Sequence, residues 1–195
     1  MEVVSPKLTT RMPVTDTISE FWEAMSVHFD VQRDASCGGH VHVTPLRNGS
    51  KFTLAELKQV AFATVVYDDH VTSVLPPARR TNGYCPSNTR AGTPALQSRL
   101  RALVAGGKNT ASLRQVASEL RSCGSPREVW AFMQKSRYVL WNFQNVCPGN
   151  SGTCTGTVEF RGGSQFLTTK GTLAWVAFVL GFVTLATEEV SLNWL

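Results

Sequence analysis

The sequence predicts an α+β fold, in which an antiparallel sheet carries helices on one face. Two short stretches, residues 39–44 and 156–161, alternate polar and apolar side chains as half-buried strands do. Residues 15–29 instead place apolar side chains at helical spacing. The elements therefore mix strands and helices, and 195 residues suffice for a single domain, 1–195, with a substantial core.

The remaining elements follow from start and turn signals along the chain. Thr53 with Glu56, and Ser125 with Glu128, are capping-box pairs that each predict a helix start. Pro, Asn and Gly are concentrated in residues 76–93, which predicts a long loop. We expect a short strand at 1–6, helices at about 15–29, 54–75, 94–104, 111–121 and 171–190, a helix that starts at 126, and strands at 39–44, 137–143 and 156–161.

The net charge is +5, and its distribution is informative. Between positions 76 and 135 the chain has ten Arg or Lys and two acids, Glu119 and Glu128. The basic side chains are spread along helices and are not interleaved with aromatic ones, unlike a nucleic-acid-binding surface. We therefore expect no nucleic acid partner, and interpret the segment as solvated helix surface or as a contact to a phosphate-bearing small molecule.

The cysteines and the apolar C-terminal run bear on location. Five cysteines fit no zinc-finger spacing, and the N-terminus has no signal-peptide pattern, so we expect a reducing, cytoplasmic setting. Cys147 and Cys154 flank a turn-like segment, which leaves a hairpin disulfide open as an alternative. The apolar run from Leu173 to Ala186 is shorter than the about 20 residues that span a bilayer, which favours a buried core helix and no membrane partner.

The candidate site begins with two histidines in one predicted strand. In a strand, residues i and i+2 point to the same face, so His40 and His42 share one face while the two flanking valines enter a core on the other. Glu159 and Arg161 repeat this geometry in the second alternating stretch. Each pair taken alone also fits an exposed strand face, with a surface salt bridge between Glu159 and Arg161.

If both strands lie in one sheet with their polar faces aligned, the four side chains converge. Histidine and glutamate together can ligate a divalent metal, and Arg161 beside that metal would bind a phosphate oxygen through its always charged fork. Arg79, Arg80 and Asn82 in the long loop add phosphate contacts in this hypothesis. A metal with several arginines suits phosphoryl transfer, in which catalysis is mostly positioning and charge stabilisation.

Three segments of the chain resemble the motifs of one enzyme family. They are "SCGGHVHV" from Ser36, "PPARRTNGYC" from Pro76 and "TVEFRGG" from Thr157. Their order is similar to that in the putative amidoligases, which are carboxylate–amine ligases related to glutamine synthetase. The resemblance spans about residues 2–186. It implies a fold like the catalytic domain of glutamine synthetase, an antiparallel sheet with helices on its back and the site on its front.

The resemblance also implies roles for individual residues. His40 and Glu159 would ligate the divalent cation, Mg²⁺ or Mn²⁺, that lies nearest the γ-phosphate of ATP, and Glu2 would reach a second cation. Arg161 would contact the transferring phosphoryl group, with His42 near the nucleotide phosphates. The residues implied to line the nucleotide and substrate mouth are Arg79, Arg80, Asn82 and Tyr84. The implied reaction activates a carboxylate as an acyl phosphate, which an amine then attacks to give an amide.

One departure from the family pattern leads to a further expectation. The family normally begins with a strand bearing two carboxylates, whereas this chain starts at "MEVVSP". The resemblance therefore implies an N-terminally incomplete domain, and we expect weak nucleotide binding and no amide product at this length. The alternatives are a non-catalytic domain of the same fold that binds nucleotide or a partner, and a zinc hydrolase built on Cys37, His40 and His42.

Overall fold

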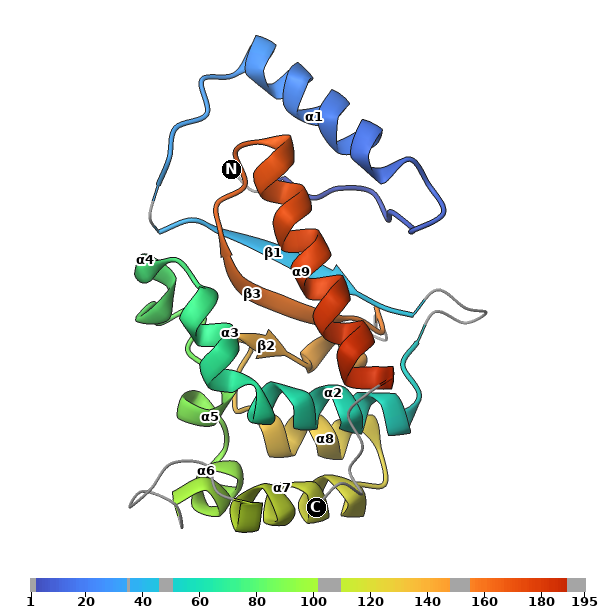
Figure 1. Cartoon of the computed structure of the whole chain (residues 1–195), viewed down its shortest axis with the longest axis vertical. Helices are drawn as coiled ribbons and strands as arrows, with labels where there is room; N and C mark the ends of the chain where they lie inside the picture. Colours follow the sequence, from blue (N-terminus) through green and yellow to red (C-terminus); the bar gives the residue numbers. More distant parts are fainter. Residues whose placement is uncertain (1–2, 35, 46–50, 102–109, 148–154, 189–195) are drawn as a thin grey trace.

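The computed structural model describes residues 3–34, 36–45, 51–101, 110–147 and 155–188, and has the α+β architecture that the sequence predicts. A small antiparallel sheet lies at the centre with helices around it (Figure 1). The elements in chain order are α1 (Val14–His28), β1 (Gly38–Val43), α2 (Leu54–Val66), α3 (Asp68–Val74), α4 (Pro77–Arg80), α5 (Asn88–Ala91), α6 (Pro94–Arg101), α7 (Thr110–Ser122), α8 (Pro126–Met133), β2 (Trp141–Asn142), the 3₁₀ helix η1 (Gln144–Val146), β3 (Val158–Ser164) and α9 (Thr169–Glu188).

The sheet order is β1–β3–β2, and both strand pairs are antiparallel. Phe160 of β3 pairs with Val41 on one side and Trp141 on the other, which makes an apolar row across all three strands. The neighbouring residue, Glu159, pairs with His42 and Asn142 and makes a polar row. Because successive residues of a strand point to opposite faces, the two rows lie on opposite faces of the sheet.

A β-bulge interrupts the pairing of β1 with β3 just beyond these rows. Val41 pairs with Phe160 but Gly39 pairs with Gly163, so two residues of β3 face the single residue His40. One of the two is Gly162, where a Cβ would lie 2.6 Å from the Leu140 side chain and 2.7 Å from the Phe160 ring. The bulge therefore requires a glycine for close packing, and its other residue is Arg161, which bears on the candidate site.

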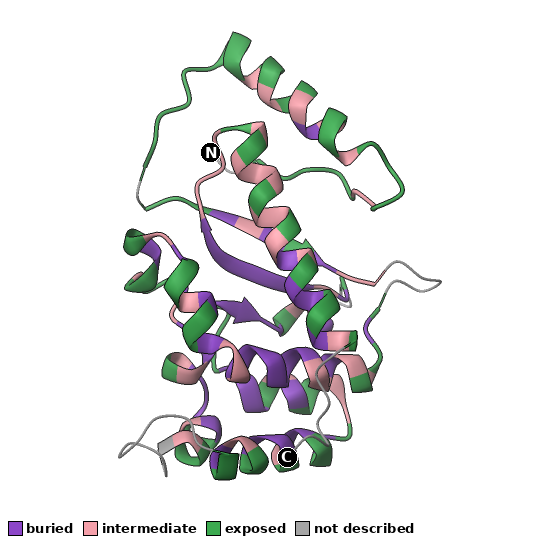
Figure 2. Cartoon of the chain, viewed as in Figure 1, coloured by how far each residue is buried: buried purple, intermediate pink, exposed green. Residues whose placement is uncertain are grey.

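The apolar face of the sheet packs against α9. Phe160 stacks on Trp175 at a centroid distance of 5.6 Å, and Trp141 stacks on Phe182 at 4.4 Å. Helix α2 completes this core, and Figure 2 shows α2 and β3 largely buried while α1 is mostly exposed. The α+β class with an antiparallel sheet is thus confirmed, and α9 covers the apolar face of that sheet.

Helix α9 is longer than the apolar run from which we predicted it. By length and composition it is the one described helix apolar enough to cross a membrane, so our argument from length was wrong. A single helix of this kind is weak evidence for a membrane span, because core helices of soluble proteins pass the same test. Its buried side chains, Val179, Phe182, Val183 and Ala186, form one face, so α9 covers the sheet with that face and leaves other positions exposed.

The outer edge of β2 is covered by a side chain. The amide of Asn88 in α5, itself fully buried, donates from Nδ2 to the carbonyl of Trp141 at 2.9 Å and accepts from the Trp141 N–H at 2.9 Å. The N–H of Leu140 donates to the carbonyl of Pro86 at 2.8 Å. Asn88 and the loop before it therefore satisfy the outward main-chain groups of Trp141 and Leu140 in place of a fourth strand.

Two predicted helix starts are confirmed at the atomic level. The Thr53 hydroxyl accepts from the Glu56 N–H, and the Glu56 carboxylate accepts from the Thr53 N–H at 2.8 Å, which completes the capping box of α2. At α8, Ser125 accepts from the Glu128 N–H, and Pro126 occupies the first helical turn.

Other predicted boundaries were wrong. The helix expected to run to Leu75 breaks at Tyr67 into α2 and α3, and the break directs the buried Asp68 toward Thr89 of α5, whose hydroxyl donates to Oδ2 at 2.5 Å. The predicted loop 76–93 contains α4 and α5, each of four residues. The strand expected at 137–143 shortens to the two residues of β2, and no strand forms in the described part of 1–6, residues 3–6.

Candidate functional site

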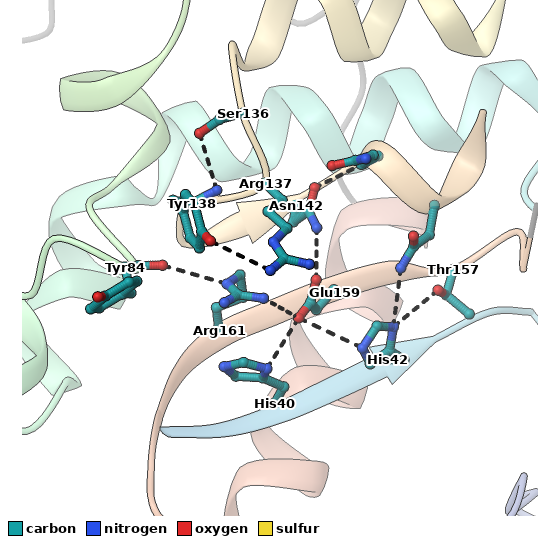
Figure 3. Close-up of polar contacts among 12 residues, drawn as sticks. His40, His42, Tyr84, Ser136, Arg137, Tyr138, Asn142, Thr157, Glu159 and Arg161 are labelled. Carbon is teal, nitrogen blue, oxygen red and sulfur yellow. Dashed lines mark hydrogen bonds and ion pairs between the residues drawn. The ribbon is translucent and has the colours of Figure 1, made fainter. Parts of the chain in front are cut away.

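Four of the predicted side chains meet on the polar face of the sheet. Figure 3 shows His40 and His42 of β1 pointing toward Glu159 of β3. Arg161, which is also on β3, lies beside Glu159. The polar row supplies His42 and Glu159, while the bulge brings Arg161 to the level of His40. The predicted alignment of the two polar strand faces is thereby confirmed.

The carboxylate of Glu159 is the centre of this cluster. Its side chain is only 6% exposed, and its oxygen Oε1 lies 2.6 Å from Arg161 Nη1, 3.2 Å from His40 Nδ1 and 3.6 Å from His42 Nε2. Its other oxygen, Oε2, accepts from Asn142 Nδ2 at 2.7 Å. Both oxygens therefore have donors, and the Arg161 guanidinium compensates the charge of a carboxylate that is almost fully removed from water.

The imidazole of His40 is held in its neutral form. Burial lowers its pKa from the ordinary value of 6.5, the nearby positive charges of Arg161 and Arg79 lower it further, and Glu159 opposes them. The 3.2 Å contact between His40 Nδ1 and Glu159 Oε1 is therefore not an ion pair near pH 7. Neutral His40 leaves Arg161 as the cationic partner of Glu159.

His42 lies at the rim of the cluster. Its Nε2 faces Glu159, while its Nδ1 lies 3.2 Å from the Thr157 hydroxyl and 3.5 Å from the side-chain amide of Asn145. Since its side chain is 45% exposed, His42 is the member of the cluster that solvent or a ligand reaches most readily.

Two tyrosines flank the guanidinium of Arg161. Arg161 Nε donates to the main-chain carbonyl of Tyr84 at 3.4 Å, and its Cζ lies 5.8 Å from the centre of the Tyr138 ring, within cation–π range. The rings of Tyr84 and Tyr138 contact each other edge to face at 5.5 Å. Tyr84 is 60% exposed, so the pair borders the cluster from the solvent side.

Arg79 of α4 lies beside the bulge residue Arg161 and is 3% exposed. Its Nη2 donates to the main-chain carbonyl of Arg161 at 2.5 Å, whereas its Nε is buried without a hydrogen-bond partner. A Cβ at Gly38 would lie 2.7 Å from Nη2, so the glycine makes room for the guanidinium. Within the described ranges no carboxylate forms an ion pair with Arg79, which makes it a buried and incompletely satisfied cation.

The other two predicted loop residues make local contacts. Arg80 Nε donates to the carbonyl of Leu75 at 2.8 Å and its Nη2 to that of Ser73 at 2.7 Å, so its guanidinium caps the end of α3 rather than joining the cluster. Asn82 Oδ1 accepts from the Tyr84 N–H at 2.8 Å, an Asx turn that positions Tyr84.

The structure does not present a complete set of metal ligands. In the described part of the chain no three His, Cys, Asp or Glu side chains are arranged to hold a metal ion. His40 and Glu159 are two of the predicted ligands and lie side by side. The oxygen of Glu159 that faces His40, Oε1, is however already paired with Arg161. Glu2 lies outside the described residues, as does Cys154, so the alternative of a disulfide with Cys147 stays open.

The same finding bears on the zinc hydrolase alternative. Cys37 is exposed, and it forms no metal-binding group with His40 and His42, all three of which are among the described residues. The arrangement therefore does not support a hydrolytic zinc centre.

Sequence reasoning missed three residues that surround the cluster. Asn142 and Tyr138 lie in the strand predicted at 137–143, with no role predicted for either, and no role is predicted for Gln134. A signal existed for Asn142, which is a polar residue in an otherwise apolar run. Gln134 directly follows α8, where no sequence pattern marks it, and only the fold brings it near Asn142.

One of the comparisons with known proteins identifies a family for this chain. A family model described as a putative amidoligase enzyme matches residues 1–183 of the chain. The chain belongs to this family. As a putative amidoligase it is a ligase-type enzyme. Neither the comparison with curated proteins nor that with solved structures of other proteins found a match.

Proposed function

We propose that this amidoligase uses ATP to join a carboxylic acid to an amine. A carboxylate oxygen of the acid attacks the γ-phosphorus of ATP, the bond to the bridging oxygen breaks, and ADP leaves. The amine nitrogen then attacks the carbonyl carbon of the acyl phosphate, phosphate leaves with the bonding electrons, and the nitrogen loses a proton to give the amide. Family membership supports the ligase class, and the arginines of the site support the phosphate chemistry.

The observation that carries the proposal is the buried guanidinium of Arg79. A cation removed from water is costly unless an anion pairs with it, and Arg79 has one carbonyl acceptor and an unsatisfied Nε. Its acceptor is the main chain of Arg161, and the charges of both arginines act on His40, so a second positive charge lies nearby. A phosphate or carboxylate group of the substrates would supply the missing negative charge, so we assign anion binding to this pair.

The divalent cation has a limited place in this proposal. Magnesium bound with ATP is held largely by phosphate oxygens and water and needs only one or two protein carboxylates. We propose that Mg²⁺ or Mn²⁺ arrives with the nucleotide, and that Arg79 and Arg161 bind the anionic groups themselves. Glu159 in its described arrangement is the ion-pair partner of Arg161.

The proposal is tested by ATP binding and ADP release. Purified protein is titrated with a fluorescent ATP analogue and then assayed for ADP release with Mg²⁺ or Mn²⁺ over a panel of acids and amines. The resemblance alone implies weak nucleotide binding and no amide product at this length, whereas the buried arginines lead us to propose the opposite outcome. We expect binding in the wild type, at least about tenfold weaker binding in Arg79→Gln, and ADP release that needs both an acid and an amine. The matched control is Arg99→Gln, since Arg99 pairs with Glu119 on the exposed surface of α6 and α7.

Each other outcome has a definite meaning. Nucleotide binding without acid- and amine-dependent turnover would overturn the ligase reaction for this chain and favour the non-catalytic alternative. Equal affinity in Arg79→Gln and Arg99→Gln would remove Arg79 from the anion site.

A further inference from the structure

A chain of buried side-chain amides ends at the central carboxylate. Gln134, which follows α8, donates from Nε2 to Asn142 Oδ1 at 2.6 Å. Asn142 donates from Nδ2 to Glu159 Oε2 at 2.7 Å. Both amide residues are 2% exposed. The described geometry thus links the end of a helix to the polar row through two consecutive hydrogen bonds.

The direction of this chain is fixed by the main chain. Gln134 Oε1 accepts from the Phe143 N–H at 2.6 Å, and its Nε2 also donates to the Ser136 carbonyl at 2.9 Å, so a flip of its amide would break every one of its contacts. Asn142 Oδ1 accepts from the Gln144 N–H at 2.9 Å as well as from Gln134. The nitrogen of Asn142 must therefore face Glu159.

We infer that Asn142, oriented by Gln134, is a positioning residue for Glu159. It occupies Oε2 and leaves Oε1 as the single oxygen that faces Arg161 and the two histidines. The carboxylate is thus held with one defined oxygen toward the cluster, and every ligand group that enters the cluster meets that same oxygen. The inference deepens the proposed function, and only its activity readout rests on it.

The cost of burying polar groups argues that Asn142 and Gln134 do more than fill the core. Buried polar groups stabilise a fold little more than well-packed apolar ones, and each unsatisfied group costs about 1–3 kcal/mol. An apolar pair would fill the positions of Asn142 and Gln134 at lower risk, but it would leave Glu159 Oε2 without a donor. The two amides serve the carboxylate, because Asn142 is its only described partner at that oxygen.

The test uses two variants that keep size and change hydrogen-bond direction. Asn142→Asp replaces the donor that faces Glu159 with a second acceptor. Gln134→Glu keeps the acceptor for the Phe143 N–H but removes the donor to Asn142, which frees the Asn142 amide to turn. The matched control is Asn88→Asp, because Asn88 is an equally buried amide whose contacts are to the main chain of Trp141.

The primary readout is the NMR spectrum of isotopically labelled histidine, recorded at one pH near neutrality. The chain has four histidines, so only four rings have to be assigned in this spectrum. We expect Asn142→Asp and, more weakly, Gln134→Glu to shift the signals of His40 and His42 while those of His28 and His70 stay in place. Asn88→Asp should lower the melting temperature and leave all four signals unchanged.

Two outcomes would overturn the inference. One is a loss of melting temperature in Asn142→Asp and Gln134→Glu with unchanged His40 and His42 signals, which would make both amides purely structural. The other outcome is measured on the wild type, so it does not depend on the folding of a variant. It is an exchange rate of the Asn142 side-chain amide protons with solvent that equals the rate for the partly exposed Asn82.

The activity arm separates this inference from the proposed function. In the ADP-release assay we expect both variants to lower kcat by about 10- to 100-fold with little change in KM for ATP, as is found for residues that orient a functional side chain. A change in KM alone would count against positioning. If the wild type releases no ADP, the proposed function fails, while the histidine signals still decide the inference.

Discussion

The two rows that cross the sheet differ in how they stabilise it. On one face Val41, Phe160 and Trp141 pack against α9, and the contacts are aromatic stacks and apolar area. On the other face the polar row, centred on Glu159, is held by directed hydrogen bonds and one ion pair. The same three strands therefore carry one row that is stabilised by apolar packing and one row that is stabilised by hydrogen bonds of defined direction.

This difference predicts how each face tolerates change. Apolar packing depends on volume, so a substitution on that face costs stability in proportion to the cavity that it leaves. The polar face depends on individual atoms, so exchanging a single oxygen for a nitrogen leaves a buried partner unsatisfied. The following predictions test this contrast, in order of decreasing effect on stability.

Trp141→Ala is expected to have the largest effect. Trp141 is 1% exposed and contacts both Phe160 and Phe182, and truncation of a buried aromatic residue costs about 3–5 kcal/mol. Urea unfolding measures the change, and Trp141→Phe is the control that restores most of the volume. A loss in Trp141→Ala no greater than in Trp141→Phe would show that the apolar row is not a volume-limited core.

Glu159→Gln is expected to cost about 3 kcal/mol, because it leaves the nearly buried Arg161 without its counter-charge. The control is Glu119→Gln, which breaks an exposed pair with Arg99 and should cost no more than about 1 kcal/mol. Unfolding free energies of the two variants are compared directly. Equal values would contradict the view that the polar face is held by a buried ion pair.

Arg161→Lys should separate the function of the polar face from its stability. Lysine keeps the charge but not the planar fork that reaches Glu159 and the Tyr84 carbonyl together. We expect a stability loss of about 1 kcal/mol and a loss of ADP release of about 100-fold. Unfolding and turnover are measured on the same preparation, and turnover equal to that of wild type would remove Arg161 from the reaction.

The smallest effect is a pH dependence confined to the polar face. His40 has its pKa lowered from 6.5 in the folded protein, chiefly by burial, so the unfolded chain takes up this proton first as the pH falls. The contribution of His40 is therefore fully present above about pH 6.5 and is lost as the pH falls through its folded pKa. Stability curves of wild type and His40→Gln, measured between neutral and mildly acidic pH, should diverge in this direction. Parallel curves would contradict it.

Alternation along single strands was enough to predict the face on which the candidate site residues lie. His40, His42, Glu159 and Arg161 have the i, i+2 spacing of a strand, and that spacing does not depend on the rest of the fold. Their roles toward ATP, a cation and the two substrates stay predictions, to be decided by the binding and turnover assays.

The parts that could not be predicted depend on contacts between distant residues. The break at Tyr67 is tied to the contact of Asp68 with Thr89, and the guanidinium of Arg80 turns back to α3. Asn142 accepts a hydrogen bond from Gln134, eight positions earlier in the chain, and no sequence pattern predicts that contact. Pairing and burial of this kind are properties of the folded chain, which local patterns do not encode.

The side chain of Asn88 has a consequence for how the sheet can grow. Because Asn88 and Pro86 satisfy the main chain of β2, an added strand finds no unpaired amides on that side. In the described part of the chain, the outer edge of β1 has no strand neighbour. The sheet can therefore grow on one side only. A further strand, whether in an assembly or in an aggregate, would pair with β1, and β1 would change from an edge strand into an interior strand.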